Sequence, residues 1–544
     1  MTARTGASDG PSAKAGAAKL ILLTLASGQF VMALDSSVMN VSIATVAQDV
    51  GTSVTGIQGA IAAYTLVMAV LMTPGGKVGA MIGRKRAFMI GCVIYGCGSF
   101  ITSISPNLTV LLLGWSFLEG VGAALILPAI VALVAGNFAE KQRPAAYGLV
   151  AAAGAIAIAL GPLIGGIATT YFSWRWVFVG EIVLIVVILM LARRMADAPP
   201  NRGTRIDVVG AVLSALGLGA FVYGVLRSDE WGWFKPKPGE PAWFGISPVV
   251  WLLLAGIFVM WLFFHWEDRL MQRGKEPLVD PTLLRNRELS GGLTMFFFQY
   301  LVQMGVFFVV PLYLSIALGL SALATGVRIL PLSLTLLLAA VGIPRLFPKA
   351  SPRAVVRIGL LAMIVGAVVL MVTLDISSGA EVTTVPLLLV GLGMGALASQ
   401  LGAVVVSAVP EERSAEIGGV QNTVTNLGAS IGTALAGSVM IAVLTSSFLT
   451  NVQESPAIPA DVKSQATTQL SGGVPFVSDA QLQSALDEAG ADTELAQAAL
   501  DANSDAQIDG LKAALAILVL TGLIGLIFVR RLPTAQPGSA RDSA

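Results

Sequence analysis

Long apolar stretches without a charged side chain recur along the whole chain. Residues 87–118 and 289–327, for example, contain no Asp, Glu, Lys or Arg. A helix needs about 20 mostly apolar residues to cross the hydrocarbon core of a bilayer, so each of these two stretches must hold a turn between two helices. The pattern predicts fourteen membrane-spanning helices, over residues 20–46, 58–80, 87–104, 108–135, 145–171, 176–193, 206–227, 247–266, 290–316, 323–343, 355–374, 384–408, 416–449 and 511–529.

The composition agrees with a polytopic membrane protein and excludes several other classes. Of the 544 residues, 55% are hydrophobic and only 12% are charged, whereas soluble domains carry about 25% charged residues. The 33 Lys and Arg nearly balance the 32 Asp and Glu, so there is no basic field of the kind that binds nucleic acid. Two cysteines are too few for a disulfide scaffold or a Cys-based metal cluster.

The basic residues are distributed unequally between the two sets of loops. If the predicted spans alternate in direction, one set of loops together with both termini holds 26 of the 33 Lys and Arg, and the other set holds 7. Cytoplasmic loops carry the excess of positive charge in membrane proteins. The sequence therefore predicts that both termini are cytoplasmic.

Residues 450–510 form the only long segment between predicted spans on the external side. The segment is rich in Gln and Ala and has ten Asp and Glu against one Lys. Ser478 followed by Asp479 is a typical helix start. We expect short amphipathic helices here, which provide a surface for a partner in the cell envelope; a solvated spacer is the alternative interpretation.

The first six and the last six predicted spans resemble copies of one another, separated by two inserted spans. Small residues recur in the fifth span of each copy, in Gly161-Pro162-Leu163-Ile164-Gly165-Gly166 and in Gly428-Ala429-Ser430-Ile431-Gly432, where they let helices approach closely. Repeated bundles with a site at their interface are typical of transporters. The predicted domains are a cytoplasmic tail (1–19), an N-terminal six-helix bundle (20–195), two inserted helices with their linkers (196–289), a C-terminal six-helix bundle that includes the external loop (290–530) and a second cytoplasmic tail (531–544).

Four short motifs occur in the order in which one transporter family carries them. They are Leu34-Asp35-Ser36-Ser37-Val38-Met39-Asn40-Val41, Gly76-Lys77-Val78-Gly79-Ala80-Met81-Ile82-Gly83-Arg84-Lys85-Arg86, the Gly161–Gly166 stretch of span five, and Ser173-Trp174-Arg175-Trp176-Val177-Phe178. With these motifs and its span count, the chain resembles the major facilitator superfamily, and within it the fourteen-spanner drug:H+ antiporter family. The resemblance implies an all-α bundle of two six-helix halves plus two inserted helices.

The resemblance also implies roles for two of the motifs. The turn after span two, with Gly76, Gly83, Arg84, Lys85 and Arg86, is expected to gate the cytoplasmic side, and topology-setting positive charge is the alternative interpretation. In span five, Gly161, Pro162, Gly165 and Gly166 are expected to form a close-packed seam of the kind found in antiporters.

The chain departs from the family pattern at positions associated with gating and proton coupling. Family members usually carry an aspartate where this chain has Ala80, and an arginine and a glutamine where it has Ser116 and Glu119. An asparagine is usual in place of Glu181, and span thirteen often has an arginine in place of Thr425. The family fold is therefore predicted without the usual elements of the cytoplasmic gate and the proton relay.

Three acidic residues inside predicted spans, Asp35, Glu119 and Glu181, are the candidates for proton coupling. A carboxylate on an apolar helix costs roughly 2.5–3.5 kcal/mol on insertion scales and is a functional candidate by default. The family fold implies that Asp35 and Glu119 face the same cavity, and counting along the helices places them at different depths, with Glu181 nearer the outer boundary. The alternatives are permanent pairing inside the bundle and, for Glu181, contact with water or an ion pair with Arg175.

Polar and aromatic residues on span nine suit contacts with an amphipathic substrate. Gln299 and Gln303 lie four residues apart, and Phe296 and Phe307 continue the same helix face. Pockets for organic molecules are mostly apolar with few polar groups. The complete predicted set is Asn40, Tyr64, Phe296, Gln299, Gln303, Phe307, Phe308 and Arg328. The alternative is that these side chains pack and form hydrogen bonds between helices.

No catalytic constellation, metal site or nucleotide-binding loop is recognisable, so we expect no enzyme and no cofactor, with a proton gradient as the energy source. The residues and the resemblance together predict a monomeric, multi-pass transporter of the bacterial inner (plasma) membrane. It would export amphipathic, often cationic, small molecules by proton antiport with alternating access. Two alternatives stay open: export of an endogenous lipid or metabolite with atypical or no proton coupling, and a non-transporting receptor or scaffold.

Overall fold

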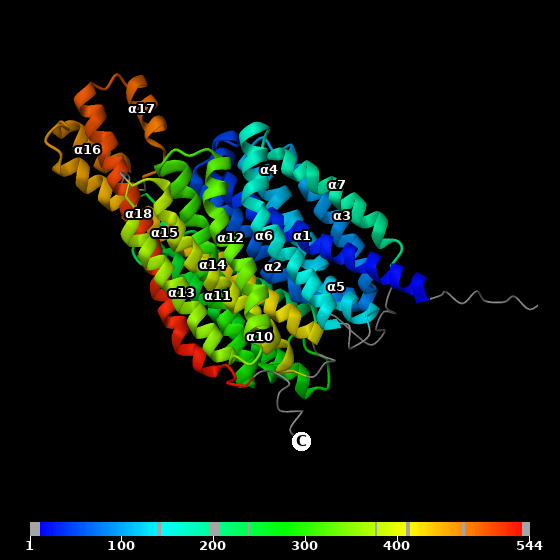
Figure 1. Ribbon diagram of the computed structural model, residues 1–544. Coiled ribbons are helices and arrows are strands. Elements are labelled where there is room, and N and C mark those ends of the chain that lie inside the picture. Colours follow the sequence, from blue (N-terminus) through cyan, green and yellow to red (C-terminus); the bar gives the residue numbers. More distant parts are fainter. Residues whose placement is uncertain are drawn as a thin grey trace, which may run out of the picture.

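The computed structural model describes residues 11–138, 143–195, 207–237, 239–375, 378–409, 414–470 and 474–535, which are largely helical (Figure 1). The first helices are α1 (Pro11–Asp49), α2 (Val54–Ile82), α3 (Arg84–Ser103), α4 (Leu108–Leu111), α5 (Gly120–Asn137), α6 (Arg143–Tyr171) and α7 (Arg175–Ala192). The inserted segment contains α8 (Val208–Leu226), α9 (Ser228–Trp231) and α10 (Pro248–Gln272). The last helices are α11 (Arg287–Leu312), α12 (Ala322–Leu346), α13 (Pro352–Thr373), α14 (Thr384–Ser407), α15 (Ser414–Glu454), α16 (Ala460–Leu470), α17 (Asp479–Glu488) and α18 (Thr493–Phe528).

The described residues contain thirteen helices that are long and apolar enough to cross a membrane, or fourteen if the bent pair Ala152–Ile158 and Leu160–Tyr171 is one span. This confirms the predicted all-α polytopic fold. Two spans contain a π-helical stretch: Leu112–Glu119 joins α4 to α5, and Tyr313–Ala317 continues α11. The end segments of the predicted tails, residues 1–10 and 536–544, lie outside the described residues.

Helix α18 starts at Thr493 in the external segment and continues through the predicted last span, 511–529. The span and part of the helical external segment thus belong to one helix. Residues 493–510 are rich in Ala, Gln and Leu, which favour a helix in water as well as in lipid, so nothing ends the helix at the membrane surface.

Helices α1–α7 and α11–α18 form two halves that lie side by side (Figure 1). The halves meet mainly along two helix pairs, α2 with α15 and α6 with α12. Helix α8 of the inserted pair contacts both α2 and α15, and α10 packs against α8. The inserted pair therefore lies beside the interface and touches both halves through α8.

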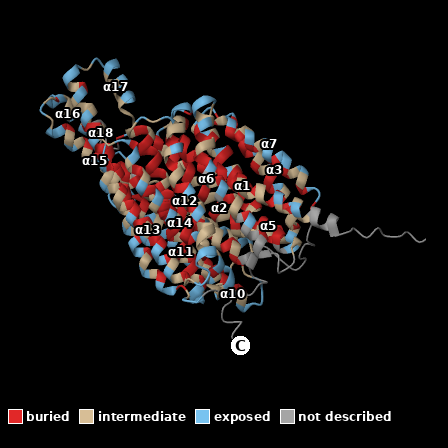
Figure 2. Cartoon of the chain, in the orientation of Figure 1, coloured by how far each residue is buried: buried red, intermediate tan, exposed pale blue. Residues whose placement is uncertain are grey.

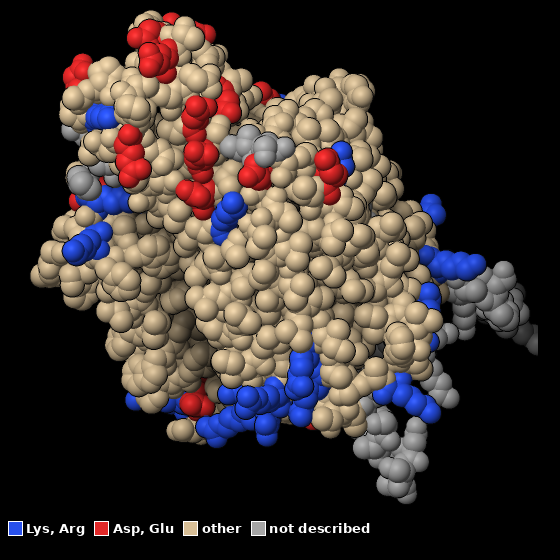
Figure 3. All heavy atoms as spheres, turned by 60° about the vertical axis from the view of Figure 1, so that its left-hand side comes forward, with Lys and Arg blue, Asp and Glu red and all other residues tan. Residues whose placement is uncertain are grey.

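Helices α16 and α17, together with the adjoining ends of α15 and α18, form a protrusion at one end of the bundle (Figure 1). The helical interpretation of residues 450–510 is confirmed, and Ser478 caps α17 as predicted. The protrusion has its own packing, since Val474 and Phe476 are buried, and the side chains of Asn503 and Gln507 donate to the Val477 carbonyl. Figure 3 shows many acidic residues on the protrusion and a group of Lys and Arg at the opposite end, called the basic end below.

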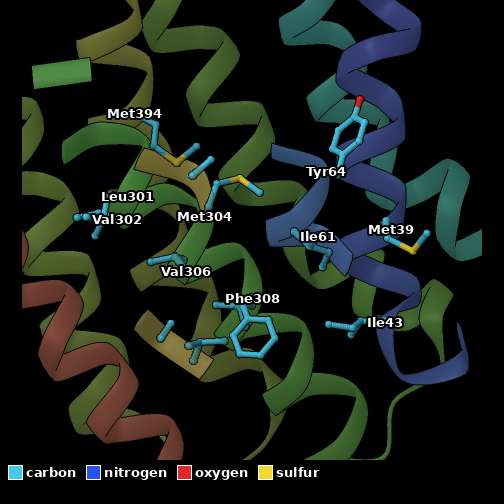
Figure 4. Close-up of a cluster of buried hydrophobic side chains, with 14 of the residues drawn as sticks. Met39, Ile43, Ile61, Tyr64, Leu301, Val302, Met304, Val306, Phe308 and Met394 are labelled. Atoms are coloured by element: carbon cyan, nitrogen blue, oxygen red, sulfur yellow. The ribbon is translucent and has the colours of Figure 1, made fainter. Parts of the chain in front are cut away.

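At the protrusion end, polar and apolar contacts close the interface between the halves. Gln58 Nε2 donates to the Thr433 carbonyl (2.9 Å), and the Leu323 N–H donates to Thr170 Oγ1 (3.0 Å). Buried apolar side chains from both halves lie in one cluster between these contacts and the middle of the bundle: Met39, Ile43, Ile61, Met304 and Phe308 (Figure 4).

Many large apolar side chains are exposed on the outside of the bundle, where a soluble protein would be polar; Figure 2 marks the exposed positions along the outer helices. On α10, Leu254, Phe258 and Trp261 are each more than half exposed. An exposed apolar surface of this extent needs a hydrocarbon environment. The burial pattern thus agrees with a multi-pass membrane protein.

The predicted seam of span five lies where α6 approaches both α1 and α12. Gly161 faces Ser37 of α1, Gly166 faces α12, and Gly326 of α12 faces Pro162, all so closely that an added Cβ atom would collide. Close backbone approach of this kind replaces the hydrophobic effect as a source of helix association in lipid. The small residues of span five thus set the spacing of α6 to helices in both halves.

We predict that Gly326→Val destabilises the protein, because the new side chain must push α12 away from the Pro162 carbonyl of α6. Overpacking of this kind costs about 1–3 kcal/mol, measurable as a lower thermal unfolding midpoint of the purified protein in detergent. Gly342→Val on the same helix is the matched control, since no neighbouring atom lies within 4 Å of its added Cβ. Equal midpoints for the two variants would contradict the prediction.

Candidate functional site

Three buried carboxyl groups meet inside the N-terminal half. Asp35 comes from α1, Glu119 ends the π-helical stretch, and Glu181 comes from α7, and each is at most 1% exposed. One oxygen from each residue lies within 4.8 Å of the others. The prediction of different depths was wrong, because counting along a helix from an assumed span end takes no account of tilt. We call these three residues the carboxyl cluster.

Asp35 is held by a tryptophan that the sequence analysis did not single out. Trp115 Nε1 donates to both carboxyl oxygens of Asp35, at 2.9 and 3.0 Å, and the Trp115 ring stacks on Tyr64 with 5.4 Å between centroids. Trp115 lies in the π-helical stretch, four residues before Glu119. This four-residue spacing could have indicated from the sequence that the Trp115 and Glu119 side chains lie on the same helix face.

A polar stripe on α3 supplies partners for the other two carboxyls. Tyr95 and Ser99 donate to Glu181 Oε2, at 3.3 and 3.2 Å, and Thr102 donates to Glu119 Oε1 at 3.2 Å. Sequence reasoning missed this stripe as well, although positions 95, 99 and 102 have the spacing of one helix face. The remaining oxygens, Glu119 Oε2 and Glu181 Oε1, are buried without a hydrogen-bond partner.

The carboxyl cluster has no basic counterpart among the described ion pairs. Arg175 does not pair with Glu181; its guanidinium binds Asp49 instead, at 2.9 Å, and donates to the Ser105 carbonyl. The Ser116 hydroxyl, on the same span as Glu119, donates to the Ala60 carbonyl of α2 at 2.8 Å. Like charges close together in an apolar interior repel strongly, so protons or another cation must offset the charge of the cluster.

The chemistry of such a cluster is the binding of cations. Protons convert each carboxylate to a neutral acid, and an organic ammonium ion offsets the same charge by electrostatic attraction, so the two compete. Carboxylate oxygens are also ligands for hard metal ions, and three of them within 4.8 Å are close enough to coordinate one ion. The stacked rings of Tyr64 and Trp115 add an aromatic surface beside Asp35.

Several of the residues predicted to contact substrate lie in one buried apolar cluster. Tyr64, Phe296 and Phe308 belong to it, and Figure 4 shows Tyr64 and Phe308 among its members. Tyr64 also stacks on Trp115, beside the carboxyl cluster. Asn40 Oδ1, Gln299 Oε1 and the Tyr64 hydroxyl are buried without a partner. Phe296 and Gln303 are also buried, whereas Phe307 and Arg328 are half-buried.

The predicted gate loop binds backbone carbonyls of its own half. Gly83 has φ +104° in the turn between α2 and α3. Arg84 donates to the Ala132 carbonyl of α5 (3.1 Å). Lys85 donates to the carbonyls of Arg193 and Met195 after α7, at 2.8 and 2.6 Å. These three hydrogen bonds fasten the loop to the N-terminal bundle, and none of the three reaches the other half.

Comparison with known proteins identifies the chain's relatives. The family model of the Major Facilitator Superfamily matches residues 25–433. A puromycin resistance protein of Streptomyces alboniger is 30% identical over 81% of this chain and 85% of its own length. A probable actinorhodin transporter of Streptomyces coelicolor is 29% identical (80% and 74%), and a riboflavin transporter of Clostridioides difficile is 26% identical (78% and 89%).

Among solved structures, an inward-facing bacterial homologue of the human lysosomal transporter Spinster has a similar fold. Its TM-score is 0.59 at 12% sequence identity, over 95% of this chain and 98% of that chain. The human organic anion transporter MFSD10 matches with a TM-score of 0.55 at 13% identity, over 96% of this chain and 100% of the other. At these identities the likeness establishes the fold alone.

We predict that Trp115→Phe destabilises the protein by about 1–3 kcal/mol, because it leaves the buried Asp35 carboxyl without its indole donor while the aromatic ring is kept. Thermal unfolding of the purified protein measures this effect. Trp176→Phe removes an exposed indole and is the control. An unchanged unfolding midpoint for Trp115→Phe would show that Asp35 does not depend on this donor.

Proposed function

The chain belongs to the major facilitator superfamily, and we propose that this drug-efflux transporter exports amphipathic, often cationic, small molecules in exchange for protons. Its relatives are named as resistance and export proteins for puromycin, actinorhodin and other antibiotics. Because those relatives come from bacteria, we place the protein in the bacterial plasma membrane, with the protrusion outside and the basic end in the cytoplasm.

One observation carries the proton part of the proposal: the carboxyl cluster is buried and has no ion-pair partner among the described residues. When no substrate is bound, protons neutralise the cluster. An arriving cation favours the ionised carboxylates and displaces protons. If the cluster faces one side of the membrane at a time, this competition couples export of the cation to proton entry.

Alternation of access follows from how the halves meet. The contacts of Gln58 and Thr170 and the apolar cluster around Phe308 close the protrusion end in this structure. Rocking of the halves about the α2–α15 and α6–α12 pairs would open that end and close the basic end. Only one side then reaches the carboxyl cluster at a time.

Metabolite export is the second candidate, and one observation favours it: a relative is named as a riboflavin transporter. Riboflavin is neutral, and a neutral substrate would not displace protons by charge competition. Transport in vesicles separates the candidates, because a proton gradient accelerates the export of a cation by antiport but leaves uncoupled movement unchanged.

We predict that Asp35→Asn lowers proton-driven ethidium transport at least about tenfold, the effect of losing roughly 1.4 kcal/mol of interaction. Glu119→Gln and Glu181→Gln lower it less, since each keeps Asp35 with its two hydrogen bonds from Trp115 and the aromatic pair beside it. The measurement is ethidium uptake into inverted vesicles with an imposed pH gradient, normalised to the amount of protein. Asp505→Asn, which removes an exposed carboxyl of the protrusion, is the control. Full activity in all three variants of the cluster would refute the proton-coupling role.

A further inference from the structure

The segment that follows the inserted helix pair contains two buried residues, whereas the rest of it is half-buried or exposed. Between α10 and α11, Leu278 is 1% exposed and Asp280 is 5% exposed. Connecting segments normally run over the surface, because buried backbone groups need partners. The partners found here come from two different helices.

Two charged side chains hold adjacent residues of this segment. Lys77, near the basic end of α2, donates from Nζ to the Pro277 carbonyl. Glu267 of α10 accepts the Leu278 N–H at Oε2 (2.7 Å). The peptide group between Pro277 and Leu278 is thus bound at its carbonyl by an ammonium from the N-terminal half and at its N–H by a carboxylate from the inserted pair.

The carboxylate is itself built into the inserted pair. Glu267 is fully buried and interacts electrostatically with Lys77 and Asp207. Gly210 of α8 leaves no room for a Cβ atom beside these carboxyl groups. Trp266 Nε1 donates to Asp207 Oδ2 (2.8 Å), which joins the basic ends of α8 and α10.

The same segment is anchored in the C-terminal half a few residues later. Asn286 caps α11 with its side-chain oxygen, which accepts the N–H groups of Glu288 and Leu289. Its Nδ2 donates to the Ala408 carbonyl after α14 (2.9 Å). The chain from Pro277 to Asn286 is therefore fastened to one half at its start and to the other half at its end.

We propose that residues 275–286 act as a strap that sets the spacing of the two halves at the basic end, with Lys77 and Glu267 as its positioning residues. In the gate loop, the hydrogen bonds of Arg84 to the Ala132 carbonyl and of Lys85 to the carbonyls after α7 stay within the N-terminal half. Lys77 instead reaches across to a segment that continues into the second half. The inserted helices therefore take part in the conformational change, because the strap must move with the halves or detach from them when they rock.

The strap is tested with the full-length protein in lipid nanodiscs by pulsed electron paramagnetic resonance. Spin labels are placed at Gly136→Cys and Lys349→Cys, exposed positions at the basic end of different halves, after Cys92 and Cys97 are replaced by alanine. The test variants are Lys77→Met and Glu267→Gln, singly and together. Lys85→Met is the matched control, since its bonds to the backbone after α7 stay within one half.

Each single variant is expected to change the ratio of the closed and open distance populations by roughly tenfold, within the usual range of coupling between sites. The double variant changes the ratio no more than the larger single one, because both act on one segment. Lys77→Arg, which keeps a donor to the Pro277 carbonyl, restores the parent distribution. Lys85→Met leaves it unchanged.

The proposal is overturned if Lys77→Met or Glu267→Gln leaves the distances as in the parent, or if Lys85→Met shifts them equally. The measurement uses neither substrate nor a proton gradient. Its result is therefore independent of whether the carboxyl cluster couples export to protons.

Discussion

The main physical constraint on this structure is the burial of ionisable carboxyl groups in an apolar interior. The carboxyl cluster combines three acids in an apolar interior, and each carboxylate there must be offset by a proton, a cation or hydrogen-bond donors. The protein supplies donors from Trp115 and from one face of α3, but no described ion pair. Because the site is short of positive charge, we propose that it binds cations.

The spacing of the helices is a second constraint, and it also follows from the lipid environment. In lipid there is little hydrophobic gain from bringing two helices together, so close backbone approach and specific hydrogen bonds decide where they meet. Gly161 and Gly326 bring α6 near α1 and α12, and Gln58 binds backbone carbonyls of α15. Such contacts have well-defined partners and can be exchanged for another set, which suits an interface that must open and close.

The sequence predicted the parts of this structure that depend on local composition. The spans, the helical external segment and the glycine seam all follow from residue type and spacing, and Asp35, Glu119 and Glu181 were visible because they interrupt apolar runs. Their convergence was not visible, since it depends on helix tilt and on the π-helical stretch before Glu119. Tyr95 and Thr102 look like ordinary interior polar residues in a sequence. The role of Lys77 was not visible either, because its partner, the Pro277 carbonyl, lies 200 residues further along the chain.

Helix α18 runs unbroken from the protrusion through the membrane-spanning region. Its 36 residues correspond to about 54 Å of rod. A rod of this length acts as a lever: a tilt of about 10° at the basic end displaces the opposite tip by roughly 9 Å. A tilt of the C-terminal half therefore displaces the protrusion end of α18 further than its basic end.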